Sequence, residues 1–170
     1  MRTEIQLGGF GGQGIVLAGV ILGEAVIRDG KNAVQAQSYG PESRGGAARS
    51  DVIISDAPID YPRVISPDVL VALSPPAYEK YRGLVKKDGI VIIDSDLVET
   101  AGEDVRRYPF SSMADDLGRR VVANIIMLGT LARTSGCVTE SSLKEAVLKN
   151  IPRGTEELNA RALEAGFGAA

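Results

Sequence analysis

Short runs of apolar residues alternate along this chain with longer stretches in which apolar residues follow a helical period. The short runs predict strands at residues 5–7, 33–37, 52–55, 69–73, 90–94 and 105–109. The periodic stretches predict helices at residues 15–28, 77–85, 124–135, 141–150 and 156–165. The order of these elements predicts an α/β protein.

Two predicted strands, residues 70–73 and 90–93, are apolar at every position, which is typical of a sheet covered on both faces. Strand–helix alternation favours parallel pairing through right-handed crossovers. The two strands that flank residues 38–49 have no helix between them, so part of the sheet is expected to be antiparallel. We therefore expect a Rossmann-like, three-layer sandwich around a mostly parallel or mixed central sheet, with residues 1–170 forming one domain.

Composition excludes several classes of protein. A chain of 170 residues with 44% apolar content can bury a sizeable core. A net charge of -3, 5% aromatic residues and no tryptophan argue against a nucleic-acid-binding surface. The first residues do not resemble a signal peptide, and the apolar stretch 15–27 is interrupted by Glu24 and too short to span a membrane. We expect a cytoplasmic protein without membrane contact.

The chain has no histidine and a single cysteine, Cys137. It can therefore form no internal disulfide, no cysteine-ligated iron–sulfur cluster of its own and no histidine-activated triad. Cys137 follows Gly136 at a predicted helix end, where a small packed residue is the expected role. No residue of this chain is predicted to be catalytic, and no metal site is predicted.

A glycine-rich loop joins the first predicted strand directly to the first predicted helix. Gly9, Gly11 and Gly14 have the G-x-G-x-x-G spacing of a dinucleotide-binding turn, with Gly12 and Gln13 between the last two. A strand, a glycine loop and a helix N-terminus together present bare backbone amides at one point. Such a point suits an anion, a phosphate or a closely docked partner.

Three interpretations of this loop remain open. A dinucleotide site also requires an acidic residue at the end of the second strand, but that strand ends at Gln37 and Ser38, and Asp29 comes before it begins. The absent acid weakens the dinucleotide interpretation. The glycines could instead serve strand–helix packing alone, or they could present the loop to another subunit or its ligand.

A polar, glycine-rich segment joins the second and third predicted strands. Its glycine pair at 45–46 clears space around Arg44, so the guanidinium could bind a carboxylate or phosphate in a bidentate manner. The alternative is a solvated loop with a Glu42–Arg44 or an Arg49–Asp51 ion pair. The residue types of this segment fit an anion-binding loop and a solvated loop equally well.

The sequence Asp94-Ser95-Asp96 follows a predicted buried strand, where sites of α/β proteins often lie. Paired carboxylates could bind a metal, but no further ligand cluster is evident nearby. Capping of the strand end and formation of a turn explain these residues more simply.

The two loops also occur in a characteristic order. Residues 8–15 read Gly-Gly-Phe-Gly-Gly-Gln-Gly-Ile, residues 39–46 read Tyr-Gly-Pro-Glu-Ser-Arg-Gly-Gly, and residues 50–55 read Ser-Asp-Val-Ile-Ile-Ser. Together with residues 68–74, 89–94 and 124–129, this ordered set resembles the gamma subunit of 2-oxoacid:ferredoxin oxidoreductases over most of the chain.

The resemblance implies a multisubunit enzyme that decarboxylates a 2-oxoacid on thiamine diphosphate with magnesium. Electrons would pass through iron–sulfur clusters to ferredoxin, and the acyl group would pass to coenzyme A. The implied partners are alpha, beta and ferredoxin-like delta subunits, which would hold the thiamine and the clusters. This chain would bind no cofactor by itself and would support the other subunits.

The resemblance also implies candidate contact residues, either at a subunit interface or near coenzyme A. They are Gly9, Gly11, Gly12, Gln13, Gly14, Glu42, Ser43, Arg44, Gly45 and Gly46.

The sequence Pro-Glu-Ser-Arg-Gly-Gly at 41–46 looks most like the 2-oxoglutarate type. Pyruvate-type chains tend to carry Glu-Arg-Arg-Gly-Ala there, and indolepyruvate-type chains carry a Ser-Gln-Arg-Gly-Gly variant. A pyruvate or branched-chain type, a stand-alone dinucleotide- or coenzyme-A-binding protein, and a homodimer of the isolated chain remain open alternatives.

Overall fold

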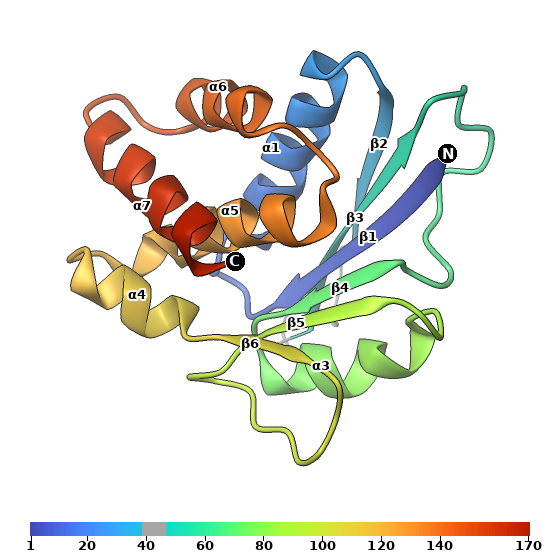
Figure 1. Cartoon of the computed structure of the whole chain (residues 1–170), viewed down its shortest axis with the longest axis horizontal. Coiled ribbons are helices and arrows are strands. Elements are labelled where there is room, and N and C mark those ends of the chain that lie inside the picture. Colours follow the sequence, from blue (N-terminus) through green and yellow to red (C-terminus); the bar gives the residue numbers. More distant parts are fainter. Residues whose placement is uncertain (39–46) are drawn as a thin grey trace.

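A mixed sheet forms the centre of the computed structural model, which describes residues 1–38 and 47–170. Within these residues the sheet has six strands in the order β2-β3-β1-β4-β5-β6 (Figure 1). The strands are β1 (Arg2–Gly9), β2 (Asn32–Gln37), β3 (Ala48–Ser55), β4 (Val69–Ala72), β5 (Ile90–Asp94) and β6 (Arg106–Tyr108). Strands β1, β4, β5 and β6 pair in parallel, whereas β3 is antiparallel to both β1 and β2. The expected mixture of parallel and antiparallel pairing is confirmed.

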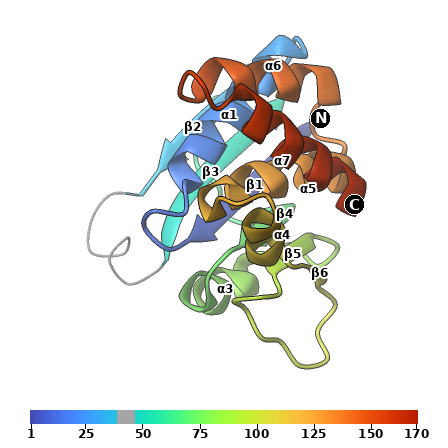
Figure 2. The same cartoon turned by 90° about the vertical axis from the view of Figure 1, so that its left-hand side faces the viewer.

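Helices cover both faces of the sheet, which explains the fully buried strand β4. One face carries the N-terminal helix and all the C-terminal helices, and the other carries α3 and the short 3₁₀ helix η1 (Figures 1 and 2). The helices are α1 (Ile15–Arg28), α3 (Pro75–Tyr81), η1 (Arg82–Leu84), α4 (Phe110–Asp116), η2 (Arg120–Val122), α5 (Ala123–Ser135), α6 (Glu140–Asn150) and α7 (Glu156–Ala169). No helix of the described residues is both long enough and apolar enough to cross a membrane.

Helices α5 and α7 cross at two glycines. A side chain at Gly166 would overlap the carbonyl oxygen of Ile126 on α5, and one at Gly129 would lie 2.6 Å from the carbonyl oxygen of Leu163. The hydroxyl of Thr130 donates a hydrogen bond of 2.9 Å to the carbonyl of Gly166 across the same crossing. The backbones therefore pack directly against each other.

Three helical features differ from the sequence prediction. Helix α4 was not predicted, because its apolar residues Phe110, Met113 and Ala114 make one helical turn within a polar stretch that is too short to show a period. The helix predicted at residues 77–85 is split into α3 and η1. Helix α7 continues four residues beyond the predicted end at 165, because Phe167 is only 2% exposed and packs in the core.

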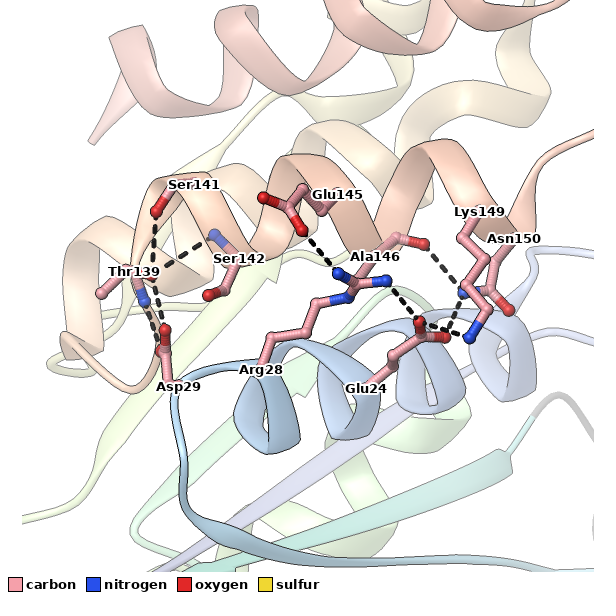
Figure 3. A network of polar contacts seen from close by, with 10 residues as sticks. All are labelled: Glu24, Arg28, Asp29, Thr139, Ser141, Ser142, Glu145, Ala146, Lys149 and Asn150. Atoms are coloured by element: carbon pink, nitrogen blue, oxygen red, sulfur yellow. Dashed lines mark hydrogen bonds and ion pairs between the residues drawn. The ribbon is translucent and has the colours of Figure 1, made fainter.

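A polar network joins α1 to α6 around Glu24 (Figure 3). The Glu24 carboxylate accepts a hydrogen bond of 2.8 Å from the Asn150 amide, and it pairs with Lys149 at 2.9 Å and with Arg28 at 3.1 Å. Arg28 also pairs with Glu145 on α6. The hydrogen bond from Asn150, together with the two cations, lowers the pKa of Glu24 from its ordinary value of 4.5 to about 2.

Replacing Glu24 with glutamine is expected to lower the free energy of unfolding by about 1 to 2 kcal/mol at pH 7, since solvent screens part of this interaction. The native pKa lies below the unfolded one, so the stabilisation is complete above the ordinary pKa of 4.5 and is lost as the pH falls towards 2. Urea unfolding across this pH range measures the difference. Glu145→Gln is the control, because the Glu145 side chain is 65% exposed and its loss should change little. A constant difference at all pH values would contradict the role of the Glu24 charge.

Helix α6 begins at a capping threonine. Thr139 is its N-cap, and its hydroxyl accepts a hydrogen bond from the Ser142 amide at 3.3 Å. The Asp29 carboxylate, at the end of α1, accepts bonds from the amide and hydroxyl of Thr139 at 2.7 and 2.6 Å (Figure 3). Gly136 ends the preceding helix in the left-handed conformation. The α1–α6 contact is therefore fixed at both ends.

Candidate functional site

The glycine loop lies between two neighbouring parallel strands whose following helices cover opposite faces of the sheet. After β1 the chain crosses to one face through α1, and after the neighbouring parallel strand β4 it crosses to the other face through α3. Crevices at the carboxyl ends of strands at such a reversal are the usual ligand and contact sites of open α/β sheets. The loop therefore occupies the position in the fold where a site is expected.

The glycines of the loop differ in conformation and in surroundings. Gly12 and Gly14 have positive φ angles of 89° and 71°, which glycine adopts without strain. A side chain at Gly14 would overlap the amide of Asn124, which donates a bond of 3.3 Å to the Gly14 carbonyl. A side chain at Gly9 would overlap the amide oxygen of Gln13. Gly11 is exposed between Phe10 and Gly12.

Gln13 fixes the shape of the loop with its side chain. Its amide oxygen accepts a hydrogen bond of 2.6 Å from the Phe10 backbone amide. Its amide nitrogen donates one of 3.0 Å to the Leu73 carbonyl, just past the end of β4. Gly14 is the N-cap of α1 and has the left-handed conformation, and as a glycine it has no side chain to cap this helix end. The loop is thus held in place by its own chain, before any ligand or partner binds.

A cavity of about 400 Å³ opens beside the loop, at the carboxyl end of β5. Its lining combines apolar residues with a few polar ones: Phe10, Gly12, Gln13, Leu73, Asp94, Leu97, Ser111, Arg120, Val121 and Ala123. An apolar cavity with a few polar side chains is the usual composition of a binding site.

Asp94 is the buried carboxylate of this cavity and is 1% exposed. It accepts a hydrogen bond of 2.7 Å from the Ser111 hydroxyl and one of 3.1 Å from the Asp96 amide. Burial raises the pKa of Asp94 above its ordinary value. Asp96 accepts a bond of 2.7 Å from the Ser112 amide near the start of α4. The predicted turn at residues 94–96 is therefore present.

Large apolar side chains are exposed around the same loop. Phe10 is 40% exposed and Val121 is 61% exposed, and both line the cavity. Leu17 and Val121 also line a neighbouring hollow of about 310 Å³ between α1 and the C-terminal helices. Val16 and Val20 lie one helical turn apart on the outer surface of α1. We call these five residues, Phe10, Val16, Leu17, Val20 and Val121, the docking face.

The second predicted segment is only partly described. Glu42, Ser43, Arg44, Gly45 and Gly46 lie outside the described residues, so the structure does not place them. The alternative ion pair of this segment, Arg49 with Asp51, is present at 2.8 Å.

The topology adds an argument against dinucleotide binding. In a dinucleotide-binding fold the second strand lies beside the first, and an acid at its end reaches the ribose. Here β3 lies between β1 and β2, so the end of β2 is one strand further from the glycine loop. Gln35 of β2 donates a bond of 2.9 Å to Ser50 of β3 instead.

The cysteine content of this chain does not fit a cysteine-ligated iron–sulfur cluster. The sequence has one cysteine, and Cys137 is buried in the core, where burial raises the pKa of its thiol. Among the described residues, no group of three or more His, Cys, Asp and Glu is arranged to hold a metal ion.

Several residues of the site were not predicted from the sequence. Asn124, Ser111, Arg120 and Val121 reach the loop from elements more than 90 residues away in the chain. Asn124 gives one usable signal, a buried amide at the start of an otherwise apolar helix. The others gave no local signal, because their positions depend on the unpredicted helix α4 and the turn after it.

The fold and this site define an α/β chain that presents a glycine loop, a cavity and an apolar face at one edge of its sheet. The family model for pyruvate ferredoxin/flavodoxin oxidoreductase matches residues 4–169. The 2-oxoglutarate synthase subunit KorC of Methanocaldococcus jannaschii is 52% identical over 98% of this chain and 93% of its own length. The ketoisovalerate oxidoreductase subunit VorA of Methanothermobacter thermautotrophicus is 36% identical, over 97% of this chain but 36% of its own length.

Among solved structures, the keto/oxoacid ferredoxin oxidoreductase gamma subunit of Geobacter sulfurreducens superposes with a TM-score of 0.87. It is 42% identical, over 99% of this chain and 98% of its own. The chain belongs to the pyruvate ferredoxin/flavodoxin oxidoreductase family. The resemblance inferred from the two loops is confirmed, and so is the expected α/β fold.

Proposed function

We propose that this chain is the gamma subunit of a 2-oxoglutarate:ferredoxin oxidoreductase. The complex oxidatively decarboxylates 2-oxoglutarate to its acyl-CoA and carbon dioxide and passes the electrons to ferredoxin. The observation that carries the proposal is the 52% identity to a 2-oxoglutarate synthase subunit over 98% of the chain. The Pro-Glu-Ser-Arg-Gly-Gly sequence at 41–46 supports the same substrate.

Within the complex, this chain assembles with the other subunits, and the catalytic steps take place on those subunits. We assign thiamine diphosphate, magnesium and the iron–sulfur clusters to the alpha, beta and ferredoxin-like delta subunits, in the cytoplasm. A chain with no histidine and one buried cysteine supports this division. Exposed apolar side chains that gather in one region can mark a contact surface, and the docking face supplies five of them around the glycine loop and α1.

The two loops are proposed to lie at the contact with the thiamine-bearing subunits, close to where coenzyme A enters. The glycine loop supports this role because it is preformed by Gln13 and flanked by the docking face. Arg44 supports it by its chemistry, since a guanidinium can bind a phosphate of coenzyme A.

The test is to produce the complex with and without this chain. With it, the complex should reduce ferredoxin when 2-oxoglutarate and coenzyme A are both present, and it should do so more slowly with pyruvate or 2-oxoisovalerate. Without it, that activity should be lost. Full activity in its absence would contradict the proposed role, and faster turnover of another 2-oxoacid would contradict the substrate.

A further inference from the structure

The side chain of Gln13 bridges the ends of two neighbouring strands. Its amide oxygen accepts a hydrogen bond of 2.6 Å from the Phe10 amide, just past β1. Its amide nitrogen donates one of 3.0 Å to the Leu73 carbonyl, just past β4. Strands β1 and β4 are parallel neighbours, and the chain leaves them towards opposite faces of the sheet. Gln13 therefore ties the glycine loop to the far side of the crevice in which a ligand is expected.

The first glycine of the motif leaves room for this bridge. A side chain at Gly9 would overlap the amide oxygen of Gln13 and would lie 2.9 Å from the end of the Ile15 side chain. The Ile15 atom is the far end of a flexible side chain, whereas the Gln13 oxygen is held by the Phe10 amide. Gly9 and Gln13 are thus a matched pair, a relation that the G-x-G-x-x-G spacing alone does not reveal.

The bridge leaves the outer amides of the loop free. Within the described part of the chain, the backbone amides of Gly11, Gly12 and Gly14 have no hydrogen-bond partner, whereas those of Phe10 and Gln13 are bonded inside the loop. Gly11 and Gly12 are also exposed. Free amides of a glycine loop are groups that bind phosphate oxygens. Because Gln13 already orders the loop, little conformational entropy is lost when such a group binds.

We propose that Gln13 is a positioning residue for coenzyme A. Its side chain holds the free amides of Gly11 and Gly12 in place for the phosphate groups of coenzyme A, and Gly9 supplies the space that this side chain needs. The inference rests on the proposed function, which brings coenzyme A to this loop. It assigns no chemical step to Gln13.

The test compares coenzyme A with pantetheine in the assembled complex. Pantetheine has the same thiol arm but no phosphate, so it reports acyl transfer without the loop amides. Gln13→Ala removes both hydrogen bonds of the bridge and should raise the KM for coenzyme A about 10-fold, as the weakening of one hydrogen bond to a charged group would. The kcat, the KM for 2-oxoglutarate and the kcat/KM for pantetheine should stay near those of the wild type. Inorganic pyrophosphate should compete with coenzyme A in the wild type and compete more weakly in the variant.

Two further variants test the bridge itself. Gln13→Glu keeps an acceptor for the Phe10 amide, but it cannot donate to the Leu73 carbonyl and its charge repels phosphate. It should therefore raise the KM for coenzyme A more than Gln13→Ala does. Gly9→Ala should reproduce the effect of Gln13→Ala, because its Cβ displaces the same amide oxygen. The double variant should then be no worse than either single variant, as is expected of two residues that act through one contact.

Asn150→Ala is the matched control. Its side-chain amide is also half-buried and makes two hydrogen bonds of 2.8 Å, to Glu24 and to the Ala146 carbonyl, but it lies in α6 and not at the glycine loop. Its loss should lower stability and leave the KM for coenzyme A unchanged.

The outcomes separate the positioning role from the proposed function. An unchanged KM for coenzyme A in the Gln13→Ala complex would overturn the role, while the proposed function would stand if the complex still required this chain. Equal losses with coenzyme A and pantetheine would also overturn it, because the phosphate groups would not be involved. So would failure of both Gln13 variants to assemble, which would place Gln13 in the subunit contact instead.

Discussion

Replacing Gly166 with alanine is expected to destabilise the chain by about 3 kcal/mol, within the range of large packing effects. The new Cβ overlaps the Ile126 carbonyl oxygen, which belongs to the backbone of α5 and cannot rotate away. Helices α5 and α7 would have to separate, and the Thr130–Gly166 hydrogen bond of 2.9 Å would be strained. Urea unfolding monitored by circular dichroism measures the loss.

Gly168→Ala is the matched control, since it makes the same substitution two residues further along α7. A Cβ at Gly168 would meet no atom within 4 Å. The greater helix propensity of alanine should make this variant neutral or slightly more stable. Equal stability of the two variants would contradict the close crossing of α5 and α7.

Replacing Leu17 with glutamate is expected to weaken binding to the partner subunits by about 100-fold, which is typical of a central contact residue. Leu17 lies on α1 and is 37% exposed. Its side chain lines the same hollow as Val121. Burying a new carboxylate there without a partner would be unfavourable. The isolated variant should fold normally, because this side chain already contacts water.

Leu84→Glu provides the comparison for this variant. Leu84 is similarly exposed, at 44%, but it lies in η1 on the opposite face of the sheet. Its replacement should leave the affinity near that of the wild type. Equal weakening by both substitutions would show that the docking face has been placed on the wrong surface.

Much of the fold could be predicted because its signals are local. The fully apolar strand β4 indicated burial on both faces, and the absence of a helix between β2 and β3 indicated their antiparallel pairing. Gly136 marked the end of a predicted helix, and it ends α5 in the left-handed conformation that glycine adopts without strain. Each of these features depends on a few consecutive residues.

The site was less predictable because it is assembled from distant segments. The glycine spacing identified the loop, but Gln13 acquires its role through the Leu73 carbonyl, 60 residues away. Asp94 was assigned to a turn correctly, yet its place in a cavity depends on Ser111 and Val121. Periodicity did not reveal helix α4, which carries Ser111. The stronger argument against dinucleotide binding came from the strand order, in which β3 separates β2 from β1, and not from the sequence of the glycine motif.

The central claim is that the docking face, beside the glycine loop, is the surface through which this chain joins its complex. Hydrogen–deuterium exchange of the chain, alone and within the assembled complex, tests it directly. The account predicts slower exchange in the complex at residues 10–20 and 120–123, with little change in η1 on the opposite face. Unchanged exchange at residues 10–20, with protection confined to the α3 and η1 side, would contradict it.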